Sequence, residues 1–167
     1  MTGVQTCALP ICLWLGDGYA GLVDAAKRDG DSAAIAVVAA VRDMAESLPC
    51  DVVSHAMVLR TTVQRQWRLF FTRYPVLLLP VSGELPFPDG LDLQGQAGFQ
   101  RVWDAQLPLR APPALGLPGL AVSTNLVGNT PVGVQILAGH YREDLCLLAG
   151  EEIEARGTPA SPVDPVS

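Results

Sequence analysis

The sequence predicts an α/β fold in which a mixed β-sheet is flanked by helices. Two β-rich runs, residues 120–124 and 132–138, are separated by a short segment of turn formers. A continuous apolar run, residues 76–79, indicates a third strand that is buried on both faces. Such a strand needs helices above and below it, and the segments around these runs repeat apolar residues at helical spacing.

Two helices are expected first in the chain, over residues 18–28 and 31–48, joined at Asp29 and Gly30. Asp31 or Ser32 would be the N-cap of the second helix, because their side-chain oxygens accept from the first free backbone N–H groups. Pro49 would end this helix, since proline cannot continue it.

A longer third helix is expected from near Asp51 until Tyr74-Pro75 ends it. Residues of mostly apolar character recur there at helical spacing, at Val53, Met57, Thr61, Gln64, Trp67 and Phe71. We expect Trp67, Phe70 and Phe71 to be buried aromatic anchors. A short helix over residues 99–106 follows the third strand candidate and its long loop, and we expect its Trp103 to face the core rather than a substrate channel.

The two β-rich runs are expected to form an antiparallel hairpin, because the link over residues 125–131 is short. Pro131 cannot donate a ladder hydrogen bond, so it marks the entry to the second strand. Gly133 leaves space for a close backbone approach. A final helix over residues 143–153 has an acidic first turn, as the helix dipole prefers, and Gly157 with Pro159 ends it.

Several of these segments are motifs in a fixed order: Gly116-Leu117-Pro118-Gly119-Leu120, then Pro131-Val132-Gly133-Val134-Gln135, then a helix opening at Arg142-Glu143-Asp144-Leu145. Upstream, residues 74–81 end an apolar strand in Pro80-Val81. This order resembles the amidase signature hydrolases, over roughly residues 67–156. The resemblance implies the C-terminal portion of the amidase signature fold, and a complete protein that hydrolyses amides to a carboxylate and ammonia or an amine.

The catalytic groups of that family are missing from this sequence. The family uses a serine nucleophile, a second serine in a cis peptide and a lysine, with the serines in a Gly/Ser-rich loop. Here the serines stand singly, outside any glycine-rich turn that could form an oxyanion hole, at positions 32, 47, 54, 82, 123, 161 and 167. The only lysine, Lys27, lies in a charged helix end and lacks the desolvation that a neutral base needs. We therefore assign no catalytic residue, expect the triad upstream, and expect this chain alone to be inactive.

The loop over residues 80–90 is the candidate binding region, because loops at the end of a sheet strand commonly line a site. In the family it borders the acyl pocket. We expect substrate-pocket lining from Ser82, Gly83, Glu84, Leu85 and Phe87. The alternative is a proline-stiffened surface turn.

The N-terminal residues 1–11 resemble the translation of a common short-read sequencing adapter, with GTG as the start codon. A signal peptide is the competing interpretation, because Cys7 to Leu15 is apolar, but no basic residue precedes it. We expect residues 1–11 to be non-native, residues 12–158 to be the C-terminal part of one amidase domain, and residues 159–167 to be a flexible tail.

Composition favours a cytoplasmic protein. The net charge of −6 and isoelectric point near 4.7 give no basic surface for nucleic acid, and the apolar runs are too short to span a bilayer. Cys50, Cys146, His55 and His140 have no metal-ligand spacing, so we expect no metal site. A Cys50/His55 nucleophilic pair lacks an orienting partner, and Cys50 is better interpreted as a small packing residue.

The sequence thus predicts a C-terminal amidase fragment. The resemblance implies no cofactor, a small-molecule amide substrate for the complete enzyme, and no nucleic-acid or membrane partner, and it allows a homodimer because relatives often dimerise. The alternative function is a non-catalytic binding or subunit module of amidase-like fold, which would use the pocket loop without catalysis.

Overall fold

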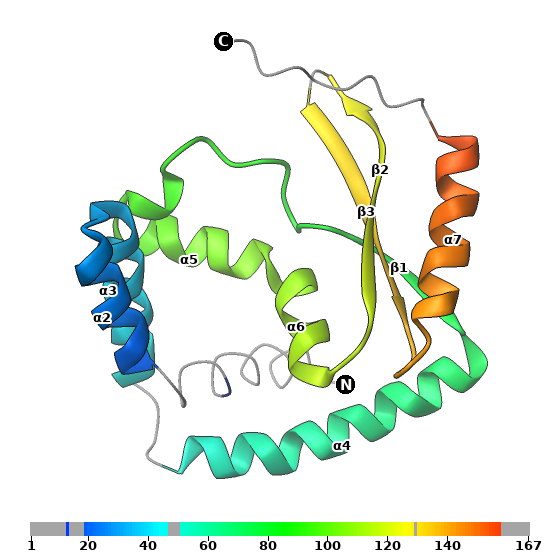
Figure 1. Cartoon of the computed structure of the whole chain (residues 1–167), viewed down its shortest axis with the longest axis horizontal. Coiled ribbons are helices and arrows are strands. Elements are labelled where there is room, and N and C mark those ends of the chain that lie inside the picture. The colour runs from blue at the N-terminus through cyan, green and yellow to red at the C-terminus, as the bar shows by residue number, and fades with distance from the viewer. Residues whose placement is uncertain (1–12, 14–18, 47–50, 129, 158–167) are drawn as a thin grey trace.

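The computed structural model describes residues 13, 19–46, 51–128 and 130–157 (Figure 1). Its elements are, in chain order, α2 (Tyr19–Asp29), α3 (Ser32–Glu46), α4 (Val52–Arg73), β1 (Val76–Pro80), the 3₁₀ helix η1 (Leu91–Leu93), α5 (Gly95–Ala105), α6 (Leu107–Leu115), β2 (Gly119–Val127), β3 (Thr130–Ala138) and α7 (Glu143–Arg156). The predicted α/β class is confirmed. The expected adapter residues and the C-terminal tail lie outside the described residues.

The described sheet has three strands in the order β1-β3-β2, and both pairings are antiparallel. The predicted hairpin of β2 and β3 is therefore confirmed, with Pro131 at its expected place near the start of β3. The strands run closer to the turn than the sequence predicts, since Val127 pairs with Thr130 and Gly128 has a left-handed φ of 61°. A register shift between Ser123 and Asn125 interrupts the ladder of β2.

The central strand β3 supplies side chains to two separate cores, because successive residues of a strand point to opposite faces. Ile136 and Ala138 pack with Val122 and Cys146 on the α7 side, and Ile136 is fully buried. Leu137, 1% exposed, belongs to a second core with residues of α4 and with the segment at the end of α6: Ala56, Val63, Phe71, Leu115 and Leu117. Both faces of β3 are thus covered.

The expectation that β1 is buried on both faces is wrong. Leu77 and Leu79 pack against the α4 core, whereas Leu78 is 54% exposed. Within the described residues β1 pairs only with β3, so it is an edge strand of that sheet. A continuous apolar run therefore indicates the correct element and the wrong burial.

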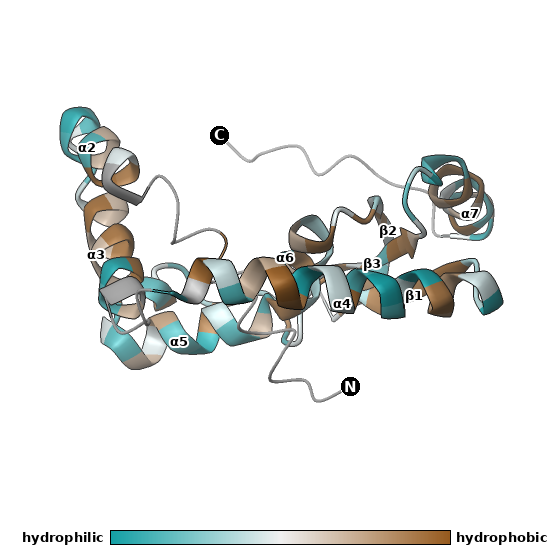
Figure 2. Cartoon of the chain, turned by 90° about the horizontal axis from the view of Figure 1, so that it is seen from below, coloured by the Kyte–Doolittle hydropathy of each residue, from teal (hydrophilic) through white to brown (hydrophobic). Residues whose placement is uncertain are grey.

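The long helix α4 crosses the molecule from the α2–α3 pair to the sheet (Figure 1), and both hydrophobic and hydrophilic residues are visible along it in Figure 2. Its buried face is rotated from the predicted one: Met57 is 49% exposed, while Ala56 and Val63 are buried at 4% and 2%. The predicted aromatic anchors agree better with the structure. Phe71 is buried, and Trp67 and Phe70 pack against the same core.

Helix α6 is absent from the predicted elements, because Pro112 and Pro113 lie inside it and proline disfavours a helix interior. Side chains from two distant segments bind its last carbonyls. Arg60 Nε donates to Ala114 O at 2.7 Å and Gln64 Nε2 donates to Leu115 O at 2.8 Å. His140 Nε2 also lies 3.0 Å from Leu115 O, and because a carbonyl only accepts, Nε2 must hold the proton. These tertiary hydrogen bonds satisfy the end of the helix.

Helices α2 and α3 form a pair at the end of the molecule opposite α7 (Figures 1 and 2). Gly30 joins them with a φ of 68°. The predicted cap is confirmed for Asp31, whose Oδ1 accepts from the backbone N–H of Ala33 at 2.8 Å and of Ala34 at 3.2 Å. The predicted helix end at Pro49 lies outside the described residues.

Candidate functional site

An open pocket of about 500 Å³ lies where β1 ends and β3 begins. The antiparallel register brings these two ends together, since Pro80 pairs with Val134. The loop after β1 forms one wall, and the residues joining α5 to α6 and the start of β3 form the others. The lining residues are Pro80, Val81, Ser82, Gly83, Glu84, Leu85, Pro86, Phe87, Gln106, Leu109, Pro131, Val132 and Gly133. All five residues predicted to line a pocket are among them.

The pocket loop is attached to the C-terminal end of α5. The backbone N–H of Gly83 donates to Ala105 O at 2.7 Å, and a Cβ on Gly83 would lie 3.4 Å from the same oxygen. Ser82 Oγ is also within 3.5 Å of Ala105 O and accepts from the N–H of Glu84 at 3.2 Å. The loop backbone at Gly83 is therefore joined directly to the end of α5.

An ion pair also links the pocket loop to α5. Arg101 on α5 donates to both carboxylate oxygens of Glu84, with Nε–Oε2 at 3.0 Å and Nη2–Oε2 at 2.6 Å, and Nε–Oε1 at 3.2 Å. The hydrogen bond from Arg101, reinforced by its charge, holds the pKa of the Glu84 carboxyl below its ordinary value. The Glu84 carboxylate is thus ionised, and the positive charge of Arg101 balances its negative charge.

We predict that the Glu84 carboxyl titrates below the ordinary range of a glutamate in this chain and returns to that range in Arg101→Gln. Because the folded-state pKa is lowered, any stability from the pair exists above the unfolded pKa and is lost as the pH falls through the folded pKa. The pair is largely exposed, so its effect on stability is expected to be small. Carbon-13 NMR of the Glu84 carboxyl as the pH is lowered from neutral measures the shift, and an unchanged titration in the variant would refute the pairing.

The lining favours binding over chemistry. Apolar groups dominate it, and Ser82, Glu84 and Gln106 are its main polar side chains. Among the described residues, neither histidine nor lysine lines this pocket, and the hydrogen bonds of Ser82 Oγ are to backbone groups. A serine without an adjacent base is a weak nucleophile. This arrangement can hold an apolar group and position it, and it offers no route to activate the hydroxyl.

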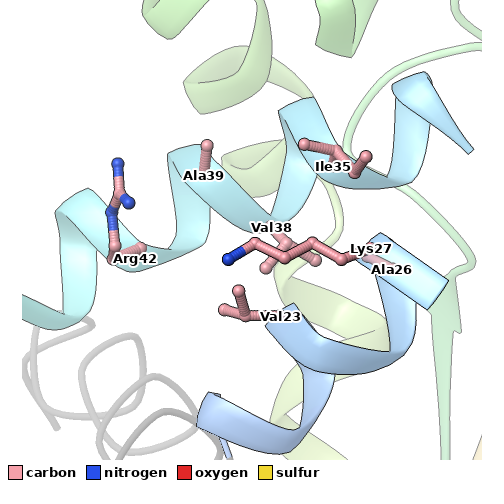
Figure 3. Close-up of a pocket in the computed structure, with 7 residues that line it drawn as sticks. All are labelled: Val23, Ala26, Lys27, Ile35, Val38, Ala39 and Arg42. Atoms are coloured by element: carbon pink, nitrogen blue, oxygen red, sulfur yellow. The ribbon is translucent and has the colours of Figure 1, made fainter. Parts of the chain in front are cut away.

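Lys27 lies elsewhere, in a small cleft of about 90 Å³ between α2 and α3 (Figure 3). The other lining residues are Val23, Ala26, Ile35, Val38, Ala39 and Arg42, so none of them is a serine, cysteine or carboxylate. Figure 3 shows the Lys27 chain extended beside Val23 and Val38. The cleft therefore brings no nucleophile to this lysine, and the structure does not join it to the pocket loop.

The remaining candidate residues are also dispersed. His55 is exposed, with Nδ1 3.6 Å from Asp51 Oδ2, and Cys50 lies outside the described residues. Cys146 is buried. Burial, followed by the charges of Glu143 and Asp144, raises the pKa of its thiol, which disfavours the reactive thiolate.

In the described ranges, no three His, Cys, Asp or Glu side chains lie close enough together to bind a metal ion. No helix in these ranges has both the length and the apolarity to cross a bilayer.

Sequence reasoning misses part of the pocket. Gln106 lies at the junction of α5 and α6, and Leu109 lies in α6, a helix that the sequence did not predict because Pro112 and Pro113 lie inside it. The sequence points to Pro131 and Gly133 only through strand geometry. Trp103 packs against Phe99 and lies under the guanidinium of Arg110, 4.2 Å from its ring centre, and it does not line the pocket.

Part of the chain is similar in sequence to two kinds of curated protein. It is 40% identical over 93 residues to an indoleacetamide hydrolase of Bradyrhizobium japonicum, covering 55% of this chain and 20% of the relative. It is 30% identical over 101 residues to a glutamyl-tRNA(Gln) amidotransferase subunit of Archaeoglobus fulgidus, covering 60% and 21%. The chain spans about a fifth of the length of these curated relatives. No family model matches it.

Solved structures share the fold at low sequence identity. An allophanate hydrolase of Kluyveromyces lactis superposes with a TM-score of 0.68 at 12% identity, covering 95% of this chain and 26% of that one. The corresponding amidotransferase subunit of Thermotoga maritima gives 0.53 at 18% identity, covering 72% and 25%. The chain is thus similar in sequence to segments of an indoleacetamide hydrolase and an amidotransferase subunit, and it shares its fold with parts of the two solved structures.

Proposed function

We propose that this chain is the C-terminal part of an amidase, and that the pocket after β1 receives the acyl group of an amide substrate. The observation that supports it most directly is the pocket itself: the loop that the family resemblance pointed to lines an apolar hollow of about 500 Å³. The sequence similarity to two indoleacetamide hydrolases also supports the proposal. Apolar hollows with a few polar groups are the usual form of small-molecule sites.

The chemistry that goes with this proposal is acyl transfer. A serine attacks the amide carbonyl, a lysine relays protons through a second serine, backbone N–H groups hold the oxyanion, and water releases the acid. Those groups would come from residues upstream of this sequence. The role of the present residues is to bind the acyl group and orient the amide toward them, which supplies part of the rate enhancement through positioning.

The test is a segment exchange in the Bradyrhizobium japonicum indoleacetamide hydrolase. Its aligned segment of 93 residues would be replaced by the matching residues of this chain, and hydrolysis of indole-3-acetamide measured. We expect the chimera to keep kcat/KM within about tenfold, which corresponds to about 1.4 kcal/mol of barrier. The chain by itself is expected to give no hydrolysis above the uncatalysed rate, because the nucleophile and base are absent.

A matched graft controls for the exchange. The same segment from the Bradyrhizobium diazoefficiens relative, also aligned over 93 residues of this chain, should give a folded and active enzyme. If that graft is active while the chimera with this chain folds cooperatively and is inactive, the amidase proposal is wrong. Such a result would favour the non-catalytic binding or subunit module. Serine-dependent hydrolysis by the isolated chain would also contradict the proposal.

A further inference from the structure

We infer that Arg101 is a positioning residue that sets the charge preference of the pocket: it holds the Glu84 carboxylate at the rim in a neutral pair, so that the pocket selects an uncharged, apolar acyl group. This inference rests on the proposed role of the pocket. The family resemblance assigns no role to Arg101.

Arg101 and Glu84 are joined by a two-point contact between a guanidinium and a carboxylate. Arg101 reaches Glu84 across 17 residues of sequence, from α5 to the pocket loop, with three N–H···O contacts between 2.6 and 3.2 Å. A planar guanidinium that binds both oxygens of a carboxylate fixes its orientation as well as its charge. Glu84 lines the pocket and Arg101 does not. Arg101 therefore acts on the pocket through Glu84.

The described residues that line the pocket are mostly apolar. Besides Glu84, none of the described residues that line the pocket is charged, and the walls include Val81, Leu85, Phe87, Leu109 and Val132. Glu84 is thus the lining side chain whose charge can favour a cation or repel an anion. While it is paired, a charged ligand gains little from it and must still lose hydration to enter an apolar hollow. An uncharged ligand avoids that cost.

The pocket loop is attached to α5 independently of Arg101. Gly83 and Ser82 bind Ala105 O through contacts that do not involve Arg101. Removal of the guanidinium should therefore leave the loop in place and release the carboxylate as a free anion at the rim. A free anion attracts cations and repels anions, so the preference among ligands changes in a defined direction.

The experiment compares three indole compounds that differ mainly in the charge of their side chain. Indole-3-acetamide is neutral, tryptamine is a cation and indole-3-acetate is an anion near neutral pH. Dissociation constants would be measured by NMR titration of the full chain. We expect the unmodified chain to bind indole-3-acetamide most tightly. In Arg101→Gln, the Kd ratio of tryptamine to indole-3-acetamide should fall about threefold, and that of indole-3-acetate should rise by a similar factor at low salt.

Matched variants separate charge from structure. Arg156→Gln removes an equivalent exposed arginine, paired with Glu152 on α7, and should leave all three ratios unchanged. Glu84→Gln combined with Arg101→Gln should restore the original preference, because no free carboxylate remains. Arg101→Lys should give an intermediate ratio, since lysine keeps the charge but not the two-point contact.

Two results would overturn the inference. One is an equal weakening of all three ligands in Arg101→Gln, which would mean that the arginine only supports the loop. The other is a chain that binds none of the three, or that binds the charged compounds as tightly as the amide. Failure of the proposed function is seen separately, as an inactive chimera, because ligand preference is measured here without turnover.

Discussion

Gly133→Ala is expected to destabilise the fold by about 2–3 kcal/mol, the range for forcing extra volume into a packed site. A Cβ at this position would lie 2.6 Å from the carbonyl oxygen of Val122 and 3.3 Å from its carbon. Both are backbone atoms of the neighbouring strand, so no side-chain rotation relieves the clash. The strands must separate, which weakens the β2–β3 ladder. Urea unfolding followed by circular dichroism measures the loss.

Gly21→Ala is the matched control, because it makes the same chemical change in open space. A Cβ at Gly21 of α2 meets nothing within 4 Å. Alanine in a helix is favoured over glycine by about 0.5–1 kcal/mol, so this variant should be slightly more stable. Equal unfolding midpoints for Gly133→Ala and the unmodified chain would show that the two strands do not approach as closely as described.

Leu137→Ala should cost about 3 kcal/mol, within the range for truncating a fully buried leucine. Leu137 is 1% exposed and packs with Val63, Phe71, Leu115 and Leu117, which come from two helical segments. Its removal leaves a cavity between the sheet and α4, and the main chain on both sides limits how far that cavity can close. The same urea experiment reports the change in the free energy of unfolding.

Leu147→Ala removes the same atoms from an exposed position. Leu147 on α7 is 59% exposed, so the change should stay within about 0.5 kcal/mol. The difference between the two leucines isolates the contribution of burial from that of side-chain chemistry. A loss at Leu137 no larger than the loss at Leu147 would contradict the assignment of Leu137 to the core.

Local patterns predict most of the elements, because their signals are contained within a few residues. Asp31 caps α3, and Pro131 and Gly133 take their expected places in β3. Burial is harder to predict. The exposure of Leu78 depends on which helices cover each face of β1, and the rotation of the α4 face depends on where the sheet and α6 meet it. Neither is written in the local sequence.

The residues of the candidate site likewise fall into a local group that the sequence predicted and a group from distant segments that it did not. Ser82, Gly83, Glu84, Leu85 and Phe87 belong to one loop, so the resemblance could point to them together. Gln106, Leu109 and Val132 reach the pocket only because the chain folds back. The Arg101–Glu84 pair joins residues 17 apart in sequence, and charge pattern alone could not have paired them. Contacts between distant segments are the part of a site that sequence spacing leaves open.

The end of α6 has a consequence for how this fold opens. Arg60 and Gln64 of α4, and His140 beyond β3, all bind its last carbonyls. Local unfolding of that turn would leave these donors without partners, and loss of α4 would expose the carbonyls. The helix with two internal prolines therefore opens together with α4 instead of fraying by itself, and backbone amides in both segments would exchange with solvent in one cooperative event.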